Sequence, residues 1–386
     1  MQVVTPKFRL ESPRHPEQIE LLRAELAERG WAETQGDDWS LFWSFDLHQD
    51  AIYRSLGPGR RVNHFPGIGA VHFKDEFARS LADAGFDGVM PETFHVGRDF
   101  DEWRAAADRQ PDTIWILKPT DLTGGRGTRI LVHPQELERS AHASGWIVQR
   151  YVADPLLLPG EPFKHSMRVY VTVTSLDPLV AFLHENGPVK FTSREFGTDP
   201  HELADPVRHL TNPSIQMTNT EQRDPVRAID WIAYSRMLEA AGIDAGALRD
   251  HIRAAVGKAI LAARGPVLRA SRHRCDSVGS CFELLGYDVT VDASLRPWLL
   301  ECNASPSLGL RGEEGSASRQ AQRRSKAPML GELLTLLGVN RAGEPARAGW
   351  TPGREEAHGG WEPIEAASTA GQSLTAEAAW SDRSDR

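Results

Sequence analysis

Apolar residues recur at helical spacing in two segments near the N-terminus. In PEQIELLRAELAERG, Ile19, Leu22 and Leu26 fall on one face of a helix, and a glycine follows the pattern. A second helical pattern runs from Lys74 to Ala84. We expect these helices and the aromatic segment between them to form a first α/β unit over residues 1–110.

From residue 113 the pattern changes to short runs of apolar and β-branched residues. TIWILKP, RILV and GWIVQRYV are typical of strands, and the glycine-rich loop TDLTGGRGT separates the first two. RVYVTVTS and LVAFLHEN flank a turn at Leu176–Pro178 and predict an antiparallel hairpin. These runs predict a central unit over residues 111–185.

A third unit is predicted over residues 186–340. It contains a mainly helical stretch from Ile229 to Arg264, with a break around Gly242–Gly246. A last hairpin of FELLGYDVTVD and PWLLECN turns at Ala293–Arg296. A short helix is expected over Met329–Leu337.

Beyond about Asn340 the sequence is rich in Ala, Gly, Glu and Ser and has no period. Such a segment buries too little apolar surface to offset its conformational entropy, so we predict a disordered tail over residues 341–386. Trp350, Trp361 and Trp380 lie within it. They could dock onto a partner, and flexible packing against the body of the protein is the simpler interpretation.

Composition excludes several functional classes. Of 386 residues 40% are hydrophobic, no apolar run reaches the roughly 20 residues of a membrane span, and the N-terminus lacks the pattern of a signal peptide. The net charge of -9 argues against a general nucleic-acid binder. The three cysteines lack metal-type CxxC spacing. We expect a cytoplasmic monomer that binds neither membranes nor nucleic acid.

The last hairpin carries the sharpest chemical pattern. Glu301 and Asn303 are two residues apart and therefore project from one face of their strand. If the turn centres between Ser294 and Leu295, Asp288 lies opposite Glu301. Two carboxylates and an amide oxygen are ligands that suit Mg²⁺. The alternative is that the two acids are edge charges and the asparagine caps a turn.

A second pattern joins a strand lysine to a glycine-rich loop. Lys118 lies in TIWILKP, and Gly124, Gly125 and Gly127 follow. Glycines let backbone N–H groups approach phosphate oxygens, and the lysine adds a fixed cation. The pattern matches no standard phosphate-binding motif, and glycine-rich turns without a ligand are common.

A third pattern is the strand KHSMR. Alternation places Lys164, Ser166 and Arg168 on one face, and His165 and Met167 on the other. Two cations on one face suit phosphates or a substrate carboxylate. Charged residues on a solvated strand face would give the same pattern.

Taken in order, these segments resemble the tubulin tyrosine ligase-like family. The resemblance rests on WILKP with its glycine loop, VQRYVADPLLL, FKHSMRVYVTVTSLDPL, HLTNPSIQ and CFELLGYDVTVDASLRPWLLECNASPSL, and covers roughly Gly30 to Leu337. The tetrad HLTN alone could be only a helix cap. The family implies an ATP-grasp fold, in which two α/β units close on ATP. It also implies Mg²⁺-dependent joining of an amino acid to a protein carboxylate through an acyl phosphate.

The resemblance implies a role for each matching residue. It assigns ATP contacts to two lysines, the glycine loop, a hinge strand at residues 149–152 and the tetrad HLTN. These residues are Lys118, Lys164, Gly124, Gly125, Gly127, Gln149, Arg150, Tyr151, Val152, Thr211 and Asn212. Magnesium binding falls to Asp288, Glu301 and Asn303. Contacts with the phosphates, the reacting carboxylate and the amino-acid site fall to Arg168, Lys190 and Lys74.

Three positions depart from the family pattern. Ser166 stands where the family usually carries Asp, Lys190 where Arg is frequent, and Pro213 where Tyr is common. A hydroxyl cannot hold a fixed negative charge, so the loss at Ser166 leaves a nucleotide-binding pseudoenzyme as one alternative. A small-molecule amide ligase is the other.

The expected substrates are a free amino acid (tyrosine, glutamate or glycine) and an acidic protein or peptide acceptor, for which tubulin is the family's best-known example. RGEEGSASRQAQRRSKAP is expected to be a loop whose basic end could attract such an acceptor, through Arg319, Arg323, Arg324 and Lys326. An ordinary solvated loop fits the sequence equally well.

Overall fold

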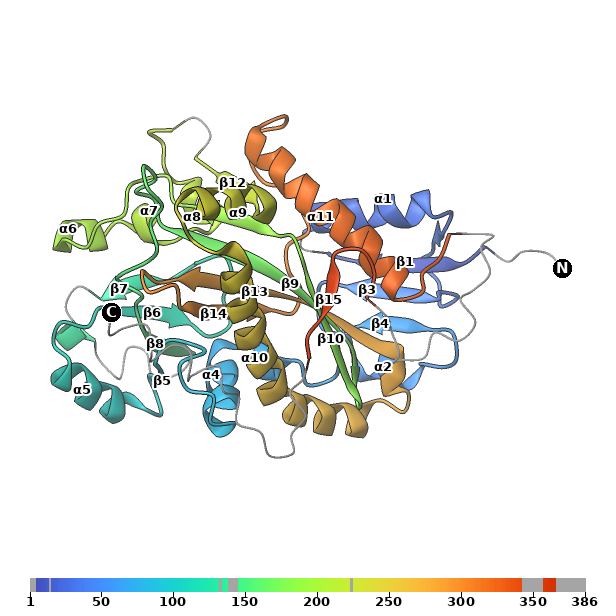
Figure 1. Cartoon of the computed structure of the whole chain (residues 1–386). Helices are drawn as coiled ribbons and strands as arrows, with labels where there is room; N and C mark the ends of the chain where they lie inside the picture. The colour runs from blue at the N-terminus through green and yellow to red at the C-terminus, as the bar shows by residue number, and fades with distance from the viewer. Residues whose placement is uncertain are drawn as a thin grey trace.

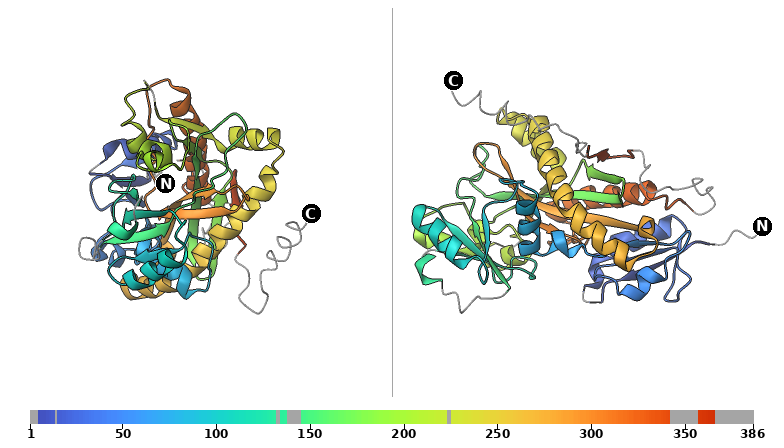
Figure 2. Two further views of the ribbon diagram at one scale, coloured as in Figure 1. Left: turned by 90° about the vertical axis from the view of Figure 1, so that its left-hand side faces the viewer. Right: turned by 90° about the horizontal axis from the view of Figure 1, so that it is seen from below.

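The computed structural model describes residues 5–13, 15–131, 134–137, 145–222, 225–341 and 357–365 of the chain. A four-stranded sheet lies at one end and a larger mixed sheet extends toward the N-terminal unit at the other (Figure 1). The view from below shows the same separation of the two ends (Figure 2, right). The predicted α/β class with ATP-grasp-like units is confirmed. The residue boundaries of those units stay predictions.

The N-terminal unit adds parallel strands to the larger sheet. Its elements are β1 (Lys7–Glu11), η1 (Pro16–Gln18), α1 (Glu20–Glu28), β2 (Ala32–Glu33), β3 (Leu41–Ser44), α2 (Asp50–Arg54), β4 (Arg61–Asn63), α3 (Gly69–His72) and α4 (Lys74–Asp83). β1 pairs with β2 and β3, and β3 with β4. Leu22 and Leu26 of α1 are fully buried, and Gly30 ends the helical region with a φ of 77°. Both predicted helices of this unit are confirmed.

The central unit is an antiparallel sheet in the order β5-β8-β6-β7. Its elements are β5 (Thr93–His95), α5 (Phe100–Arg109), β6 (Trp115–Pro119), β7 (Arg129–Leu131), η2 (Pro134–Glu136) and β8 (Trp146–Arg150). Trp103 of α5 packs edge-on against Trp115 of β6, with ring centroids 6.3 Å apart. This core covers one face of the sheet and leaves the other face free to line a cavity.

The larger sheet supplies the rest of the framework. Its remaining strands are β9 (His165–Leu176), β10 (Leu179–His184), β11 (Pro188–Phe191), β12 (Arg227–Asp230), β13 (Cys281–Val291), β14 (Pro297–Asn303) and β15 (Trp361–Pro363). β9 and β10 form the predicted antiparallel hairpin. β13 pairs with β9, β14 and, in parallel, with β4, so it joins the N-terminal unit to the rest.

Two hydrophobic cores cover opposite faces of this sheet. Leu285 and Tyr287 of β13 face the core under α10 (Ala245–Arg274), whereas Phe282 and Leu284 face the core of α1 and α11 (Ala317–Leu336). The other helices are α6 (Pro200–Leu203), α7 (Pro206–His209), α8 (Pro213–Gln216), α9 (Trp231–Ala240) and η4 (Val278–Ser280). In the described part of the chain, no helix has both the length and the hydrophobicity needed to cross a bilayer.

The predicted helical stretch from Ile229 to Arg264 is partly wrong. Its break near Gly242 is confirmed, but Ile229 belongs to β12, and α10 continues ten residues beyond Arg264 to Arg274. Pro266 does not end the helix, because later turns pack on the N-terminal unit. The Ser271 hydroxyl there donates to the carbonyl of Pro66 at 3.0 Å.

The predicted basic loop before Met329 is also wrong. Residues 317–336 form the single helix α11, so the expected short helix is only its second half. Lys326 is buried and donates to the Gly309 carbonyl at 2.7 Å, and Arg319 donates to the Leu310 carbonyl at 2.8 Å. Arg324 bonds Asp230 at 3.1 Å. These three groups tie α11 to the body of the protein, whereas Arg323, the fourth predicted basic residue, is exposed.

The predicted disordered tail is wrong for one described segment. β15 pairs with β10 in antiparallel register, and the Trp361 side chain is fully buried. Its indole packs on His184, with ring centroids 4.9 Å apart. The rest of the predicted tail, including Trp350 and Trp380, lies outside the described residues.

Candidate active site

A cavity of about 770 Å³, measured with its open mouth, lies between the four-stranded sheet and the larger sheet. Most of the residues predicted for the site line it. They are Lys74, Lys118, Gly125, Gln149, Arg150, Tyr151, Val152, Lys164, Lys190, Thr211, Asn212, Asp288 and Glu301. Four predicted residues do not line it: Gly124, Gly127, Arg168 and Asn303.

The two predicted carboxylates face each other across the last hairpin, since Asp288 of β13 pairs with Glu301 of β14. The predicted turn centre between Ser294 and Leu295 is wrong, because the strand pairs nearest the turn are symmetric about Ser294 itself. That symmetry alone would place Leu300 opposite Asp288. A β-bulge at Leu300 shifts the register by one residue and restores the carboxylate pair.

Asp288 is the centre of a buried charge cluster. Arg168 donates to its two oxygens at 2.9 and 3.0 Å, and Lys190 donates to Oδ1 at 3.0 Å. Burial raises the pKa of Asp288, but the charges of Arg168 and Lys190 outweigh burial and hold that pKa well below its usual range. Gly286 provides the space, since a Cβ there would lie 2.9 Å from the Arg168 Cδ.

Glu301 faces a second cation. Its Oε2 lies 3.5 Å from the Nζ of Lys74, which also donates to the Leu122 carbonyl at 2.8 Å. Lys74 therefore connects α4, the start of the glycine loop and the acidic hairpin. This arrangement places a cation from the N-terminal unit at the predicted phosphate end of the cavity.

Of the three predicted metal ligands, the two carboxylates line the cavity and Asn303 does not. Asp288 and Glu301 bring oxygen ligands of the kind that Mg²⁺ prefers to a cavity also lined by lysines. The side-chain amide of Asn303 donates instead to the Gly286 carbonyl at 3.3 Å. The structure thus brings two of the three predicted metal ligands together in the cavity.

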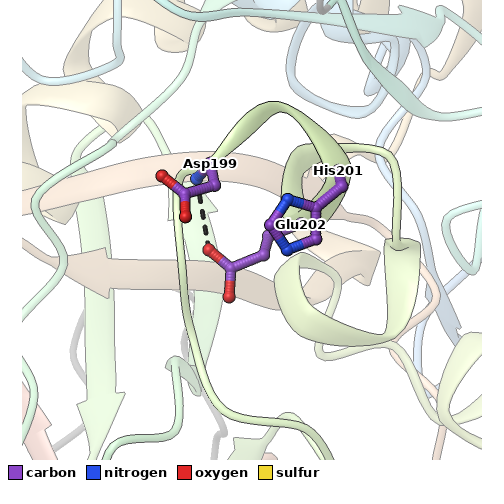
Figure 3. Close-up of side chains that lie close together, drawn as sticks. All are labelled: Asp199, His201 and Glu202. Atoms are coloured by element: carbon purple, nitrogen blue, oxygen red, sulfur yellow. Dashed lines mark hydrogen bonds between the residues drawn. The ribbon is translucent and has the colours of Figure 1, made fainter.

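Another acidic group lies apart from this pair. Asp199, His201 and Glu202 are close enough to share an ion, and within the described ranges no other three His, Cys, Asp or Glu residues are (Figure 3). Their proximity follows from the capping of α6, where the Asp199 backbone N–H donates to Glu202 Oε2 at 3.2 Å. None of them lines the cavity.

Lys118 is held at the back of the cavity by the hinge strand. Its ammonium donates to Gln149 Oε1 at 2.6 Å, and the Gln149 amide donates to Thr93 Oγ1 at 2.8 Å. Burial lowers the pKa of Lys118 to about 8. A buried cation whose described hydrogen-bond partner is a neutral amide is suited to receive an anion.

Lys164 is the second such cation. Its ammonium donates to the Tyr151 hydroxyl at 2.7 Å and lies 3.9 Å from the centroid of the same ring. Burial lowers its pKa to about 7, and the charge of Lys118 acts in the same direction. The cavity is therefore lined by two buried lysines, both of which the family resemblance assigns to ATP contacts.

The glycine loop approaches the polar tetrad. Gly124, Gly125 and Gly127 all have positive φ angles, of 70°, 77° and 71°. A Cβ on Gly125 would lie 3.0 Å from Asn212 Oδ1, and the Ser214 hydroxyl donates to the Gly124 carbonyl at 2.7 Å. Glycine is needed here because the loop packs against the start of α8.

Ser166 lines the cavity at the position of the expected acid. Its hydroxyl lies 2.5 Å from that of Thr211, and its Cα pairs with that of Lys190 across β9 and β11. His165 bonds the Tyr234 hydroxyl at 2.6 Å in the core below. The predicted alternation along this strand is confirmed.

Several residues that line the cavity were not predicted for the site, and His209 is one of them. His209 lines the cavity wall beside Tyr151, with its Nδ1 2.9 Å from the Tyr151 hydroxyl. Its position in the tetrad HLTN could have identified it, because Thr211 and Asn212 of the same tetrad are candidate ATP contacts.

Comparison with known sequences agrees with this geometry. The tubulin-tyrosine ligase family model matches residues 54–318. Human tubulin polyglutamylase TTLL5 is 30% identical over 339 residues, which cover 82% of this chain and 25% of the human protein. Mouse probable tubulin polyglutamylase TTLL2 is 29% identical in an alignment that covers 83% of this chain and 60% of the mouse protein. Caenorhabditis elegans probable tubulin polyglutamylase ttll-9 is also 29% identical, and the alignment covers 81% of this chain and 76% of the nematode protein. The chain thus spans about a quarter of the human relative, and it belongs to the tubulin-tyrosine ligase family.

Proposed function

We propose that this protein is an ATP- and Mg²⁺-dependent ligase that joins glutamate to a side-chain carboxylate in an acidic protein tail. The observation that carries the proposal is the cavity in which the Asp288 and Glu301 carboxylates face buried lysines. The choice of glutamate, and of a tubulin-like acceptor, draws support from relatives that are named tubulin polyglutamylases.

ATP would bind between the two sheets. Its phosphates would meet Lys118 and Lys164, which are desolvated and lack a carboxylate partner among the described residues. The hinge residues Gln149 to Val152 line the same cavity and would face the base. Gly125 would bring the glycine loop over the phosphates without a side chain between them.

Asp288 and Glu301 would hold Mg²⁺. When bound, the ion would neutralise charge on the transferring phosphate oxygens. Arg168 already makes two hydrogen bonds to Asp288, so its role is to orient that carboxylate. Lys190 contributes one described hydrogen bond to Asp288, and its other N–H groups are available to the substrate.

The reaction follows from the chemistry of carboxylates. Oxide is a poor leaving group, so the acceptor carboxylate would attack the terminal phosphorus of ATP and form an acyl phosphate with release of ADP. The glutamate amine would then attack the acyl carbon, and phosphate would leave as the amide forms. Lys190 and Lys74 would stabilise the negative charge that builds up on the transferring oxygens.

One observation favours a second candidate, a nucleotide-binding pseudoenzyme. Ser166 and Thr211 bond each other where the family usually supplies a carboxylate, so this position offers no charge for an ammonium group. The paired acids Asp288 and Glu301 favour catalysis instead.

The test is incubation of the purified full-length protein with Mg-ATP, glutamate and a glutamate-rich peptide, followed by mass spectrometry and ADP measurement. We expect peptide adducts that increase by one glutamate at a time. Glu301→Gln should abolish them, and the matched control Glu239→Gln, on the exposed face of α9, should not. Tight ATP binding without ADP or adducts would favour the pseudoenzyme, and full activity of Glu301→Gln would refute its assigned role.

A further inference from the structure

His209 is a buried histidine at the end of α7 whose hydrogen bonds fix its tautomer. Its side chain is 3% exposed, and Nε2 lies 2.8 Å from the carbonyl oxygen of Glu202. A carbonyl oxygen can only accept, so Nε2 carries the proton. In the neutral ring Nδ1 is then an acceptor. Burial lowers the pKa of His209 to about 4, so the ring is neutral at physiological pH.

This tautomer sets the direction of the next hydrogen bond. The Tyr151 hydroxyl lies 2.9 Å from His209 Nδ1, so the hydroxyl donates a hydrogen bond to this ring nitrogen. The phenolic oxygen then has lone pairs for another donor. Lys164 supplies that donor, with its Nζ 2.7 Å from the same oxygen. The three side chains form one directional chain from Lys164 through Tyr151 to His209.

The far end of this chain is anchored to the backbone. Glu202 lies in α6, and its carbonyl oxygen accepts the hydrogen bond from His209 Nε2. The Glu202 side chain accepts a hydrogen bond from the Asp199 backbone N–H and so caps that short helix (Figure 3). His209 is also stacked edge-on between Tyr151 and Phe196, with centroid distances of 5.7 and 5.6 Å. The imidazole is therefore fixed both by packing and by hydrogen bonds.

The near end of the chain faces the cavity. Lys164 is 5% exposed and lines the cavity wall, and in the described part of the chain no carboxylate lies within ion-pairing distance of it. A desolvated ammonium group with unused N–H groups is set to bind an anionic ligand. Its position depends on the Tyr151 oxygen and hence on His209.

We propose that His209 is a positioning residue for the nucleotide, which holds the Tyr151 hydroxyl so that Lys164 presents its ammonium group to the phosphates. This inference rests on the proposed function, because it assumes that Lys164 binds ATP. His209 does not itself contact the nucleotide. The alternative is that the imidazole serves only as a packing ring between Tyr151 and Phe196.

Three substitutions separate these roles. His209→Phe keeps an aromatic ring of similar size but removes the acceptor for Tyr151. His209→Asn loses the ring, and its side-chain oxygen can still accept from the Tyr151 hydroxyl. Tyr151→Phe removes the middle member of the chain. Thermal unfolding of each variant shows whether it folds, and calorimetric titration with Mg-ATP measures binding.

We expect His209→Phe and Tyr151→Phe each to weaken Mg-ATP binding about tenfold, within the range expected for the loss of one hydrogen bond. Because the two residues act in one chain, the double variant should bind no more weakly than Tyr151→Phe alone. His209→Asn should bind ATP more tightly than His209→Phe despite lower thermal stability. In the ligase assay, KM for ATP should rise more than kcat falls.

The opposite pattern would overturn the inference. Parent-like ATP binding by a folded His209→Phe, or weaker binding by His209→Asn than by His209→Phe, would show that the ring acts through packing. Additive losses in the double variant would show that Tyr151 and His209 act separately. If the parent protein binds no Mg-ATP, the proposed function fails, and this inference fails with it.

Discussion

Lys164→Met should stabilise the protein while weakening its binding of ATP. The variant removes the buried charge and keeps an unbranched side chain of similar length. Lys164 has a pKa of about 7 in the folded protein, against an ordinary value of 10.5. That difference makes burial of its charge cost the folded state roughly 4 kcal/mol at pH 7.

The stability gain should depend on pH in a defined direction. Between pH 7 and 10.5 the unfolded chain binds more protons at Lys164 than the folded chain does, so the stability of the parent rises with pH. By the same linkage the penalty falls to roughly 2 kcal/mol at pH 9. The advantage of Lys164→Met over the parent should therefore be largest near pH 7 and about half as large at pH 9.

Thermal unfolding of both proteins without nucleotide, at pH 7 and pH 9, measures this difference. We expect the midpoint of Lys164→Met to lie several degrees above that of the parent at pH 7, with a smaller gap at pH 9. Lys258→Met, on α10 away from the cavity, is the matched control and should change the midpoint little. A lower midpoint for Lys164→Met, or a gap that does not change with pH, would refute the reasoning.

Three further predictions concern other parts of the structure. Asp288→Asn leaves Arg168 and Lys190 buried without their shared charge, so the unfolding free energy should fall by about 3 to 5 kcal/mol; an unchanged denaturation midpoint would contradict this. Ser166→Asp places a carboxylate across from Lys190 and should raise glutamate-dependent ADP release; a lower rate would mark the serine as an adaptation. Trp361→Ala should reduce stability by about 3 to 5 kcal/mol, because its indole is fully buried; parent-like urea denaturation would exclude β15 from the core.

Most of the residues singled out from the sequence line one cavity, but some details of the local geometry could not be predicted. Asp288 and Glu301 were paired correctly, although the assumed turn centre was wrong by half a residue. The bulge at Leu300 compensates for that error, and alternating patterns contain no signal for a single extra residue. Asn303 does not line the cavity, and its Nδ2 donates to the Gly286 carbonyl.

The first half of helix α11 could not be predicted from a hydrophobic pattern. Its buried positions recur with helical spacing, but several of them hold Ser, Gln or Lys, as at Gln322, Ser325 and Lys326. A hydrophobic pattern cannot reveal such a face. Their partners include the Gly309 carbonyl and the Arg311 backbone, in the loop that directly precedes α11, and a hydrophobic pattern does not identify such polar partners. α11 also contains Pro328, a residue that is disfavoured inside a helix.

The contact between Tyr151 and His209 could not be predicted from the sequence for a similar reason. Tyr151 and His209 are far apart in sequence, and each has an ordinary local explanation, one in a strand end and the other in a helix cap. Only the fold brings the end of β8 against α7. Trp361 is a comparable case, because an isolated aromatic residue in a polar tail gains its partner from β10.

Isotope transfer tests the central claim most directly. An acidic peptide whose side-chain carboxylates carry oxygen-18 is incubated with the protein, Mg-ATP and glutamate, and the phosphate and nucleotide products are analysed by mass spectrometry. Formation of an acyl phosphate requires that released phosphate contain one labelled oxygen for each glutamate added. Label in AMP, or glutamate addition with unlabelled phosphate, would contradict the account.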